Sequence, residues 1–202
     1  DDTDGITLFL VRSDAPGLEV ESQSRLDGRA AAIVRLQNVS VPDKDVLGPV
    51  QGGLTALNHS VDVATVGLCA EMLGGMKQIF QDTLAYLKTR EQFGSVIGSF
   101  QALKHRAAKV FMEIELCRSS VMAAAAAVDD GTDDIPLLTS LAKARCSDAF
   151  VLATNEAVQM HGGIGMTDEH DAGFYMKRAR AAEMTFGDGA WHRDRWAKLR
   201  GY

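Results

Sequence analysis

The sequence predicts a mainly helical α+β protein, in which part of a β-domain precedes an up-and-down four-helix bundle. Two observations carry this prediction. Short runs of β-forming residues separated by turns occupy the chain before Gly52, and apolar residues spaced by three or four fill the chain after it. The change of period divides the chain into two expected domains, residues 1–50 and residues 51–202.

The β-rich part contains four predicted strands, at residues 6–11, 18–20, 30–36 and 39–41. Proline, glycine and aspartate pairs such as Pro16-Gly17 separate them. Four short strands with open edges cannot close a barrel or a sandwich. We therefore expect the sheet to need further strands. The opening residues 1–5 have the composition of a turn, which indicates a chain that begins within a larger protein.

Long helices are predicted in the rest of the chain, over residues 54–90, 100–128 and 134–161, with shorter ones over residues 169–182 and 190–199. Gly131 should break the second helix, and Pro136 suits the first turn of the third, where its missing N–H group costs nothing. The third helix has a face of small residues that favours close helix packing: Leu138, Ala142, Cys146, Ala149, Ala153 and Ala157.

The composition excludes several classes of protein. Lys and Arg number 21 and Asp and Glu 27, a net charge of −6, and no basic cluster is present, so nucleic acid is a poor partner. Charged residues interrupt every apolar run, so no membrane span is expected. Three widely spaced cysteines without a CxxC motif favour reduced thiols and a cytoplasmic location.

The first of three glycine-containing loops runs from Arg90 to Gly94 (Arg-Glu-Gln-Phe-Gly). A guanidinium fork, an aromatic face and a flexible glycine suit a phosphate with a stacked ring. The alternative interpretation is an ordinary helix C-cap.

The second loop, residues 161–167 (His-Gly-Gly-Ile-Gly-Met-Thr), offers backbone N–H groups to an anion. It follows a helix instead of a strand and lacks the P-loop lysine, so by itself it is a weak signal.

The third loop places Asp188 between two glycines, where it is a candidate general base or, alternatively, a helix N-cap. The spacing of His161, His170 and His192 matches no metal motif, so no metal is expected. No GxSxG motif or similar arrangement supports a nucleophilic mechanism.

The order of these features resembles the C-terminal half of an acyl-CoA dehydrogenase. The residues that carry the resemblance are Arg90-x-x-Phe93-Gly94, the later Phe100-Gln101, and Gln159-x-x-Gly162-Gly163-x-Gly165. It covers essentially the whole chain. It implies that residues 1–50 form the later part of the middle β-domain and residues 51–202 the C-terminal helical domain.

The resemblance implies FAD as cofactor and an acyl-CoA thioester as substrate. Arg90 would pair with the FAD pyrophosphate, and Phe93 and Gln101 would line its adenosine-ribose end. Gln159, Gly162 and Gly163 would hold the ADP portion of a neighbour's flavin. A homo- or hetero-oligomer, dimer or tetramer, with FAD at the subunit interface therefore follows.

The implied reaction removes the acyl-CoA α-proton with a carboxylate while the β-hydride passes to the flavin, giving a 2-enoyl-CoA. Here the match fails, because the family's two positions for the catalytic Glu fall on Phe186 and Ala64. Thr65 stands where the family usually has Arg, although Asp62 of the substrate-side motif is retained.

Three hypotheses remain open. The chain is the non-catalytic partner in a heteromeric enzyme, similar to the paired actinobacterial subunits that act on steroid CoA thioesters. Alternatively, Asp188 has taken over as the base, or the protein is a flavin-free helical interaction subunit. The first is favoured over the second, because a shorter carboxylate two residues away must recover a demanding geometry.

Overall fold

A computed structural model describes residues 5–202, so most of the predicted opening turn lies outside the described residues. The chain forms two compact units, one ending at Val61 and the other running from Asp62 to Tyr202. Within residues 5–202, no helix is long and apolar enough to cross a membrane.

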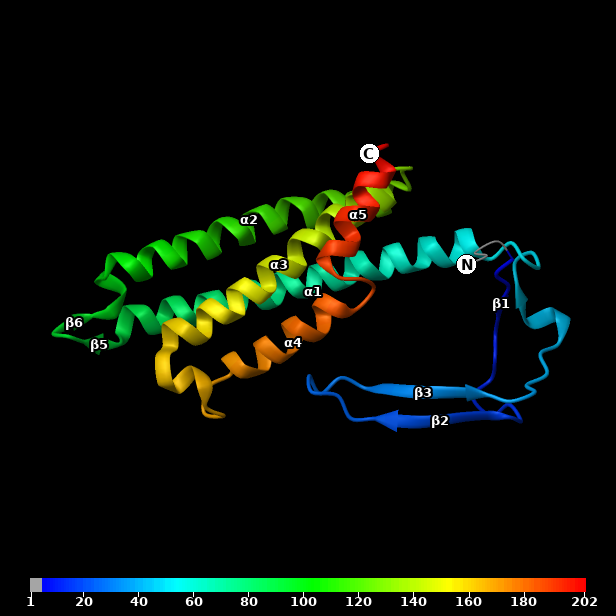
Figure 1. The fold of residues 1–202 in the computed structure, drawn as a ribbon, viewed down its shortest axis with the longest axis horizontal. Helices are drawn as coiled ribbons and strands as arrows, with labels where there is room; N and C mark the ends of the chain where they lie inside the picture. The colour runs from blue at the N-terminus through cyan, green and yellow to red at the C-terminus, as the bar shows by residue number, and fades with distance from the viewer. Residues whose placement is uncertain (1–4) are drawn as a thin grey trace. The chain divides into compact units, whose positions relative to one another are not determined.

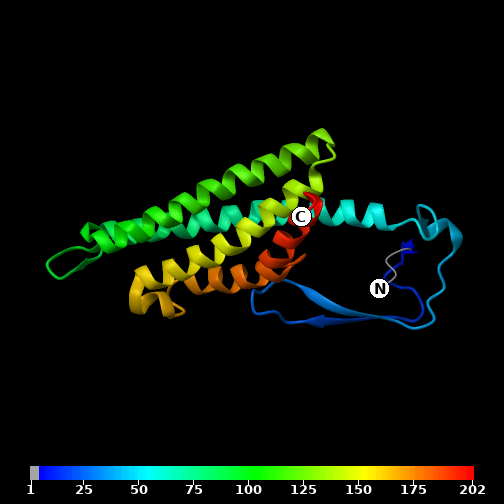
Figure 2. The ribbon, with the colours of Figure 1, turned by 45° about the horizontal axis from the view of Figure 1, so that its top comes forward.

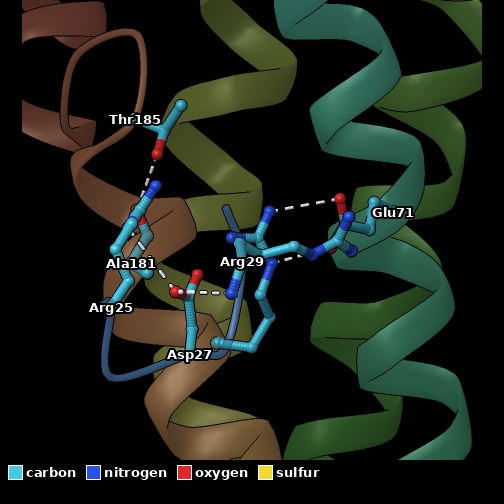
Figure 3. Close-up of polar contacts among 7 residues, drawn as sticks. Arg25, Asp27, Arg29, Glu71, Ala181 and Thr185 are labelled. Atoms are coloured by element: carbon cyan, nitrogen blue, oxygen red, sulfur yellow. Dashed lines mark hydrogen bonds and ion pairs between the residues drawn. The ribbon is translucent and has the colours of Figure 1, made fainter. Parts of the chain in front are cut away.

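The first unit contains two antiparallel strand pairs. Strands β2 (Leu18–Gln23) and β3 (Ala31–Leu36) form a hairpin with Leu18 opposite Leu36, and β1 (Leu8–Phe9) pairs with β4 (Val46–Leu47) (Figure 1). In the loop between β2 and β3, Asp27 accepts a hydrogen bond from the Arg29 backbone N–H at 3.4 Å and pairs with Arg25 at 3.5 Å (Figure 3).

The strand predicted at residues 39–41 is wrong. This segment is irregular, because Asn38 before it has a left-handed φ of 51° and Pro42 after it has no N–H group to donate to a ladder. The 3₁₀ helix η1 (Asp43–Asp45) follows directly. The strand predicted at residues 6–11 shrinks to β1, since its partner β4 offers only two residues.

Apolar side chains of the β2–β3 hairpin are exposed: Val20 by 58%, Val34 by 57% and Leu36 by 60%. A two-stranded hairpin is marginally stable by itself. Among the described residues of the first unit, no third strand pairs with this hairpin.

The helices match the sequence predictions closely. They are α1 (Leu54–Thr89), α2 (Gln101–Asp130), α3 (Ile135–His161), α4 (Ala172–Met184) and α5 (Gly189–Leu199). The first eight residues of α1 belong to the first unit. In the second unit, α2 and α3 run side by side and α4 and α5 lie against α3 (Figures 1 and 2).

One core joins α1, α2, α3 and α4, which confirms the predicted helical bundle. Its buried members include Met72, Ile114, Cys117, Ala149 and Ala179, each from one of these helices. From Ala142 to Ala157, the small residues predicted to line the core face of α3 are buried, and Leu138 is partly buried. Small side chains on the central helix let its neighbours approach closely.

The predicted helix ends also follow from local chemistry. Gly131 ends α2 in the left-handed conformation, at φ 63°, and its N–H group donates to the carbonyls of Ala127 and Val128. Pro136 lies in the first turn of α3, as expected.

Candidate functional site

The loop after α1 is a β-hairpin instead of a simple helix C-cap. Strands β5 (Glu91–Gln92) and β6 (Ser95–Val96) pair, and Phe93 and Gly94 connect them with φ values of 55° and 76°. Two consecutive left-handed residues are typical of a tight two-residue hairpin turn. The turn leaves Phe93 91% exposed, with its ring 6.1 Å from that of Phe100.

Arg90 leads into this hairpin and Gln101 leaves it as the first residue of α2. The Arg90 backbone is fixed, since its N–H donates to Tyr86 and its carbonyl accepts from Ile97. Its side chain is exposed and has no hydrogen-bond or ion-pair partner in residues 5–202. The guanidinium is therefore free to bind an anion.

The second group of predicted residues lines one open pocket. Gln159, Gly162 and Gly163 share a pocket of about 300 Å³ whose other walls are Asn155, Val158, Met166 and Met176. Gly162 begins the 3₁₀ helix η3 (Gly162–Met166) with φ 65° and ψ −140°, a conformation that glycine alone adopts readily. Side-chain atoms added at Gly162 or Gly163 would enter open space.

A buried histidine anchors the start of this glycine segment, and sequence reasoning missed its role. His161 is 3% exposed, its Nδ1 donates to the Ala157 carbonyl at 2.7 Å, and its ring lies 4.0 Å from that of His170 and 4.6 Å from that of Tyr86. Burial lowers the pKa of His161. Its position directly before the glycines is the sequence signal from which this role could have been inferred.

Tyr86 lies four residues before Arg90, so its contact with His161 connects the end of α1 to the glycine segment. Figure 1 shows the β5–β6 hairpin and the turn between α3 and α4 at the same end of the second unit. The structure thus brings the two predicted anion-binding segments to one end of the bundle.

The third loop connects α4 to α5, and in it Asp188 is the N-cap of α5. Its Oδ1 accepts the Trp191 backbone N–H at 2.8 Å. This geometry matches the alternative interpretation of Asp188. Phe186, two residues earlier, has a left-handed φ of 60° and a side chain that is 43% exposed.

Asp62 is buried and bound by Arg195 of α5. Nη1 of Arg195 lies 2.5 Å from Oδ1 and Nη2 lies 2.8 Å from Oδ2, while Nη1 also reaches Ser140 Oγ at 3.3 Å. Ala64, two residues later, is exposed, and Thr65 is buried. Arg195 also lies 5.6 Å from the Trp191 ring, so Asp62 and the α5 N-terminus belong to one cluster.

No group of three or more His, Cys, Asp or Glu side chains within residues 5–202 is arranged to hold a metal ion. The three cysteines are free and buried, and Cys146 lies against Cys69 and Cys117. These neighbours and burial raise the pKa of the Cys146 thiol, so it is protonated and unreactive.

Comparison with known proteins identifies the family. Residues 51–199 match the acyl-CoA dehydrogenase C-terminal domain. The short/branched chain specific acyl-CoA dehydrogenase of Bos taurus, a mitochondrial protein, is 33% identical over 179 residues, covering 87% of this chain and 41% of that protein. Acyl-CoA dehydrogenase IpdE2 of Mycolicibacterium smegmatis is 40% identical over 143 residues, covering 68% and 43%.

Among solved structures, the steroid ACAD Tcur3481-Tcur3483 matches with a TM-score of 0.86 and 31% identity, over 96% of this chain and 51% of that one. The chain therefore belongs to the acyl-CoA dehydrogenase family of flavin oxidoreductases. It spans less than half the length of the two curated relatives.

Proposed function

We propose that this chain is the C-terminal part of an FAD-dependent acyl-CoA dehydrogenase, or of a subunit of one, that forms the α,β-double bond of acyl-CoA thioesters. The observation that carries the proposal is the unpaired Arg90 at the same end of the bundle as the open pocket of Gln159, Gly162 and Gly163. An anionic pyrophosphate on an acidic protein needs a guanidinium and free backbone donors, and this end of the bundle offers both.

These residues fit FAD. Arg90 would bind the pyrophosphate, Phe93 and Gln101 the adenosine-ribose end, and Gln159 with the two glycines the ADP portion of a neighbour's flavin. When bound, FAD supplies a hydride acceptor for the substrate β-carbon. Gly162 and Gly163 leave the space that a close backbone approach to a phosphate requires.

We also propose the domain organisation: residues 1–50 as the later part of a β-domain and residues 51–202 as the helical domain. The exposed apolar side chains of β2 and β3 support the first assignment. A two-stranded hairpin is marginally stable alone, so further strands of a larger β-domain are expected to pack against it. The shared core of α1 to α4 supports the second.

The residues at the two positions of the family's catalytic Glu favour the hypothesis of a non-catalytic subunit. Phe186 and Ala64 cannot take a proton, and Asp188 already uses Oδ1 to cap α5. A base must be within hydrogen-bond reach of the proton that it removes, and a cap fixes the Asp188 carboxylate at the helix end. In this proposal the partner subunit supplies the carboxylate. The match to a steroid ACAD named as a pair, Tcur3481-Tcur3483, agrees with such an assembly.

Asp188 as the base is the second candidate, and Asp188→Asn separates the two. Asparagine is as good an N-cap as aspartate, so the helix stays intact while proton transfer is lost. The proposal predicts unchanged turnover in the assembled enzyme. A loss of about 10²-fold or more would make Asp188 the base.

A flavin-free interaction subunit is the third candidate. Flavin that co-purifies with the full-length protein, seen as its absorbance band, would rule this candidate out.

We also propose a cytoplasmic location, with which the free, buried cysteines agree.

A further inference from the structure

A buried lysine lies beneath the loop between α4 and α5. The Lys143 side chain is fully buried, and Nζ donates to the Gly187 carbonyl at 2.6 Å, the Glu183 carbonyl at 3.0 Å and Ser147 Oγ at 3.2 Å. Three acceptors match the three donors of an ammonium group. The Gly187 carbonyl belongs to the loop that joins α4 to α5, and the Glu183 carbonyl to the last turn of α4.

His192 binds the same segment from α5. It is 1% exposed, and its Nε2 donates to the Phe186 carbonyl at 3.0 Å, which fixes the proton on Nε2 because a carbonyl only accepts. Lys143 and His192 thus hold two consecutive carbonyl groups, those of Phe186 and Gly187, from the interior of the bundle.

The backbone between these two anchors is strained. Phe186 has φ 60°, which is rare for a bulky side chain, and Gly187 has φ 99°. Such a conformation persists only where surrounding contacts impose it, and it concentrates at functional sites. With its carbonyl held inside, Phe186 presents its ring outward, where it is 43% exposed.

We propose that Lys143 and His192 are positioning residues, which hold the Phe186-Gly187 segment so that the side chain at position 186 faces the reacting carbon of the acyl-CoA. The inference rests on the proposed function. In this chain the side chain so presented is a phenyl ring, which takes no proton, and the scaffold that would position a base is intact.

A carboxylate at position 186 should therefore create a base that this chain itself lacks. In Phe186→Glu, the new carboxylate would take the α-proton, and FAD, when bound, would supply the acceptor for the β-hydride, so that the acyl-CoA would leave as 2-enoyl-CoA. Anaerobic mixing of the full-length, flavin-loaded protein with butyryl-CoA should then give a phase of flavin bleaching in addition to any that the parent protein shows. Lys143→Met, added to this variant, should slow the new phase by about 10²-fold, since small displacements of a reacting group are that costly.

Matched variants separate positioning from folding. Ser147→Ala removes one acceptor of Lys143 and leaves its hydrogen bond to the Gly187 carbonyl of the loop, so the new phase should persist. His192→Gln keeps an N–H donor for the Phe186 carbonyl and should retain the phase, whereas His192→Leu should lose most of it. Flavin content and the melting temperature of each variant show that the protein remains folded and loaded.

The outcomes are distinct. A new phase in Phe186→Glu that persists at full rate with Lys143→Met and with His192→Leu overturns the inference. So does a flavin-loaded Phe186→Glu protein with no new phase. Failure of the parent protein to bind any flavin overturns the proposed function instead.

Discussion

Arg195 and Asp62 form a two-pronged ion pair between α5 and α1, with Nη1–Oδ1 at 2.5 Å and Nη2–Oδ2 at 2.8 Å. Asp62 is 2% exposed, and both of its carboxylate oxygens accept hydrogen bonds from Arg195 inside the protein. The sequence predicted a substrate-side role for Asp62. That role stays a prediction. In the structure, Asp62 also links α1 to α5 through its ion pair with Arg195.

Removing one partner of a buried ion pair leaves the other charge uncompensated. Asp62→Ala should therefore lower the free energy of unfolding by about 3 kcal/mol. Asp148→Ala is the matched control, because Asp148 also pairs with an α5 arginine, Arg193, at 2.7 Å but with both side chains more than half exposed. It should cost less than about 1 kcal/mol. Urea denaturation measures both, and equal losses would refute this assignment.

His192 should make stability depend on pH. Burial, first of all, lowers its pKa from 6.5 to about 4, so in the unfolded chain it takes up a proton at higher pH than in the folded protein. Stability should fall as the pH drops from about 6.5 towards 4, by up to about 3 kcal/mol from this residue. His192→Gln should flatten the profile of unfolding free energy against pH in that window. The part due to His161, whose pKa is also lowered, should remain.

Gly162 and Gly163 should respond differently to the same added methyl group. Gly162→Ala meets a positive φ and should cost about 1–3 kcal/mol of stability. Gly163 has no positive φ, and its added methyl group enters open space, so Gly163→Ala should leave the melting temperature unchanged. The same methyl group occupies room proposed for the ADP portion of FAD, so FAD affinity should fall in both variants. Unchanged affinity in Gly163→Ala would contradict the placement.

Asp188 should contribute to stability as an N-cap. Asp188→Ala should lower the free energy of unfolding by about 1 kcal/mol, and Asp188→Asn by only a few tenths, because asparagine accepts the Trp191 N–H equally well. Thermal unfolding of the two variants tests this, and an equal loss in both would show that charge matters and not the cap.

The helices could be predicted from the sequence because their apolar spacing and end signals agree. Gly131 and Pro136 end and begin helices where expected. The strands were predicted less well. Strands β2 and β3 lie where residues 18–20 and 30–36 predicted them. Residues 39–41 form no strand although they have β-forming side chains, because they are confined between a left-handed Asn38 and Pro42. Whether a segment forms a strand also depends on its backbone conformation and hydrogen bonding, which the pattern of side chains does not reveal.

The site was predictable only in part, for a related reason. Exposed polar and glycine residues such as Arg90 and Gly162 stand out in the sequence, because neither has a place in a helical core. Lys143 and His192 do not stand out, because a lysine or histidine inside a helical pattern usually faces solvent. Only the fold shows that they point inward and bind the carbonyls of one loop.

The central claim is that Arg90 binds the pyrophosphate of FAD, and titration of the full-length apoprotein with FAD tests it most directly. Arg90→Met should weaken FAD binding by at least about tenfold, since a charge-assisted contact is worth about 1.5–3 kcal/mol. Arg200→Met, which removes the same charge at the end of α5, should bind FAD as the parent does. If the parent binds no FAD, or if Arg90→Met and Arg200→Met bind it equally well, the account is contradicted.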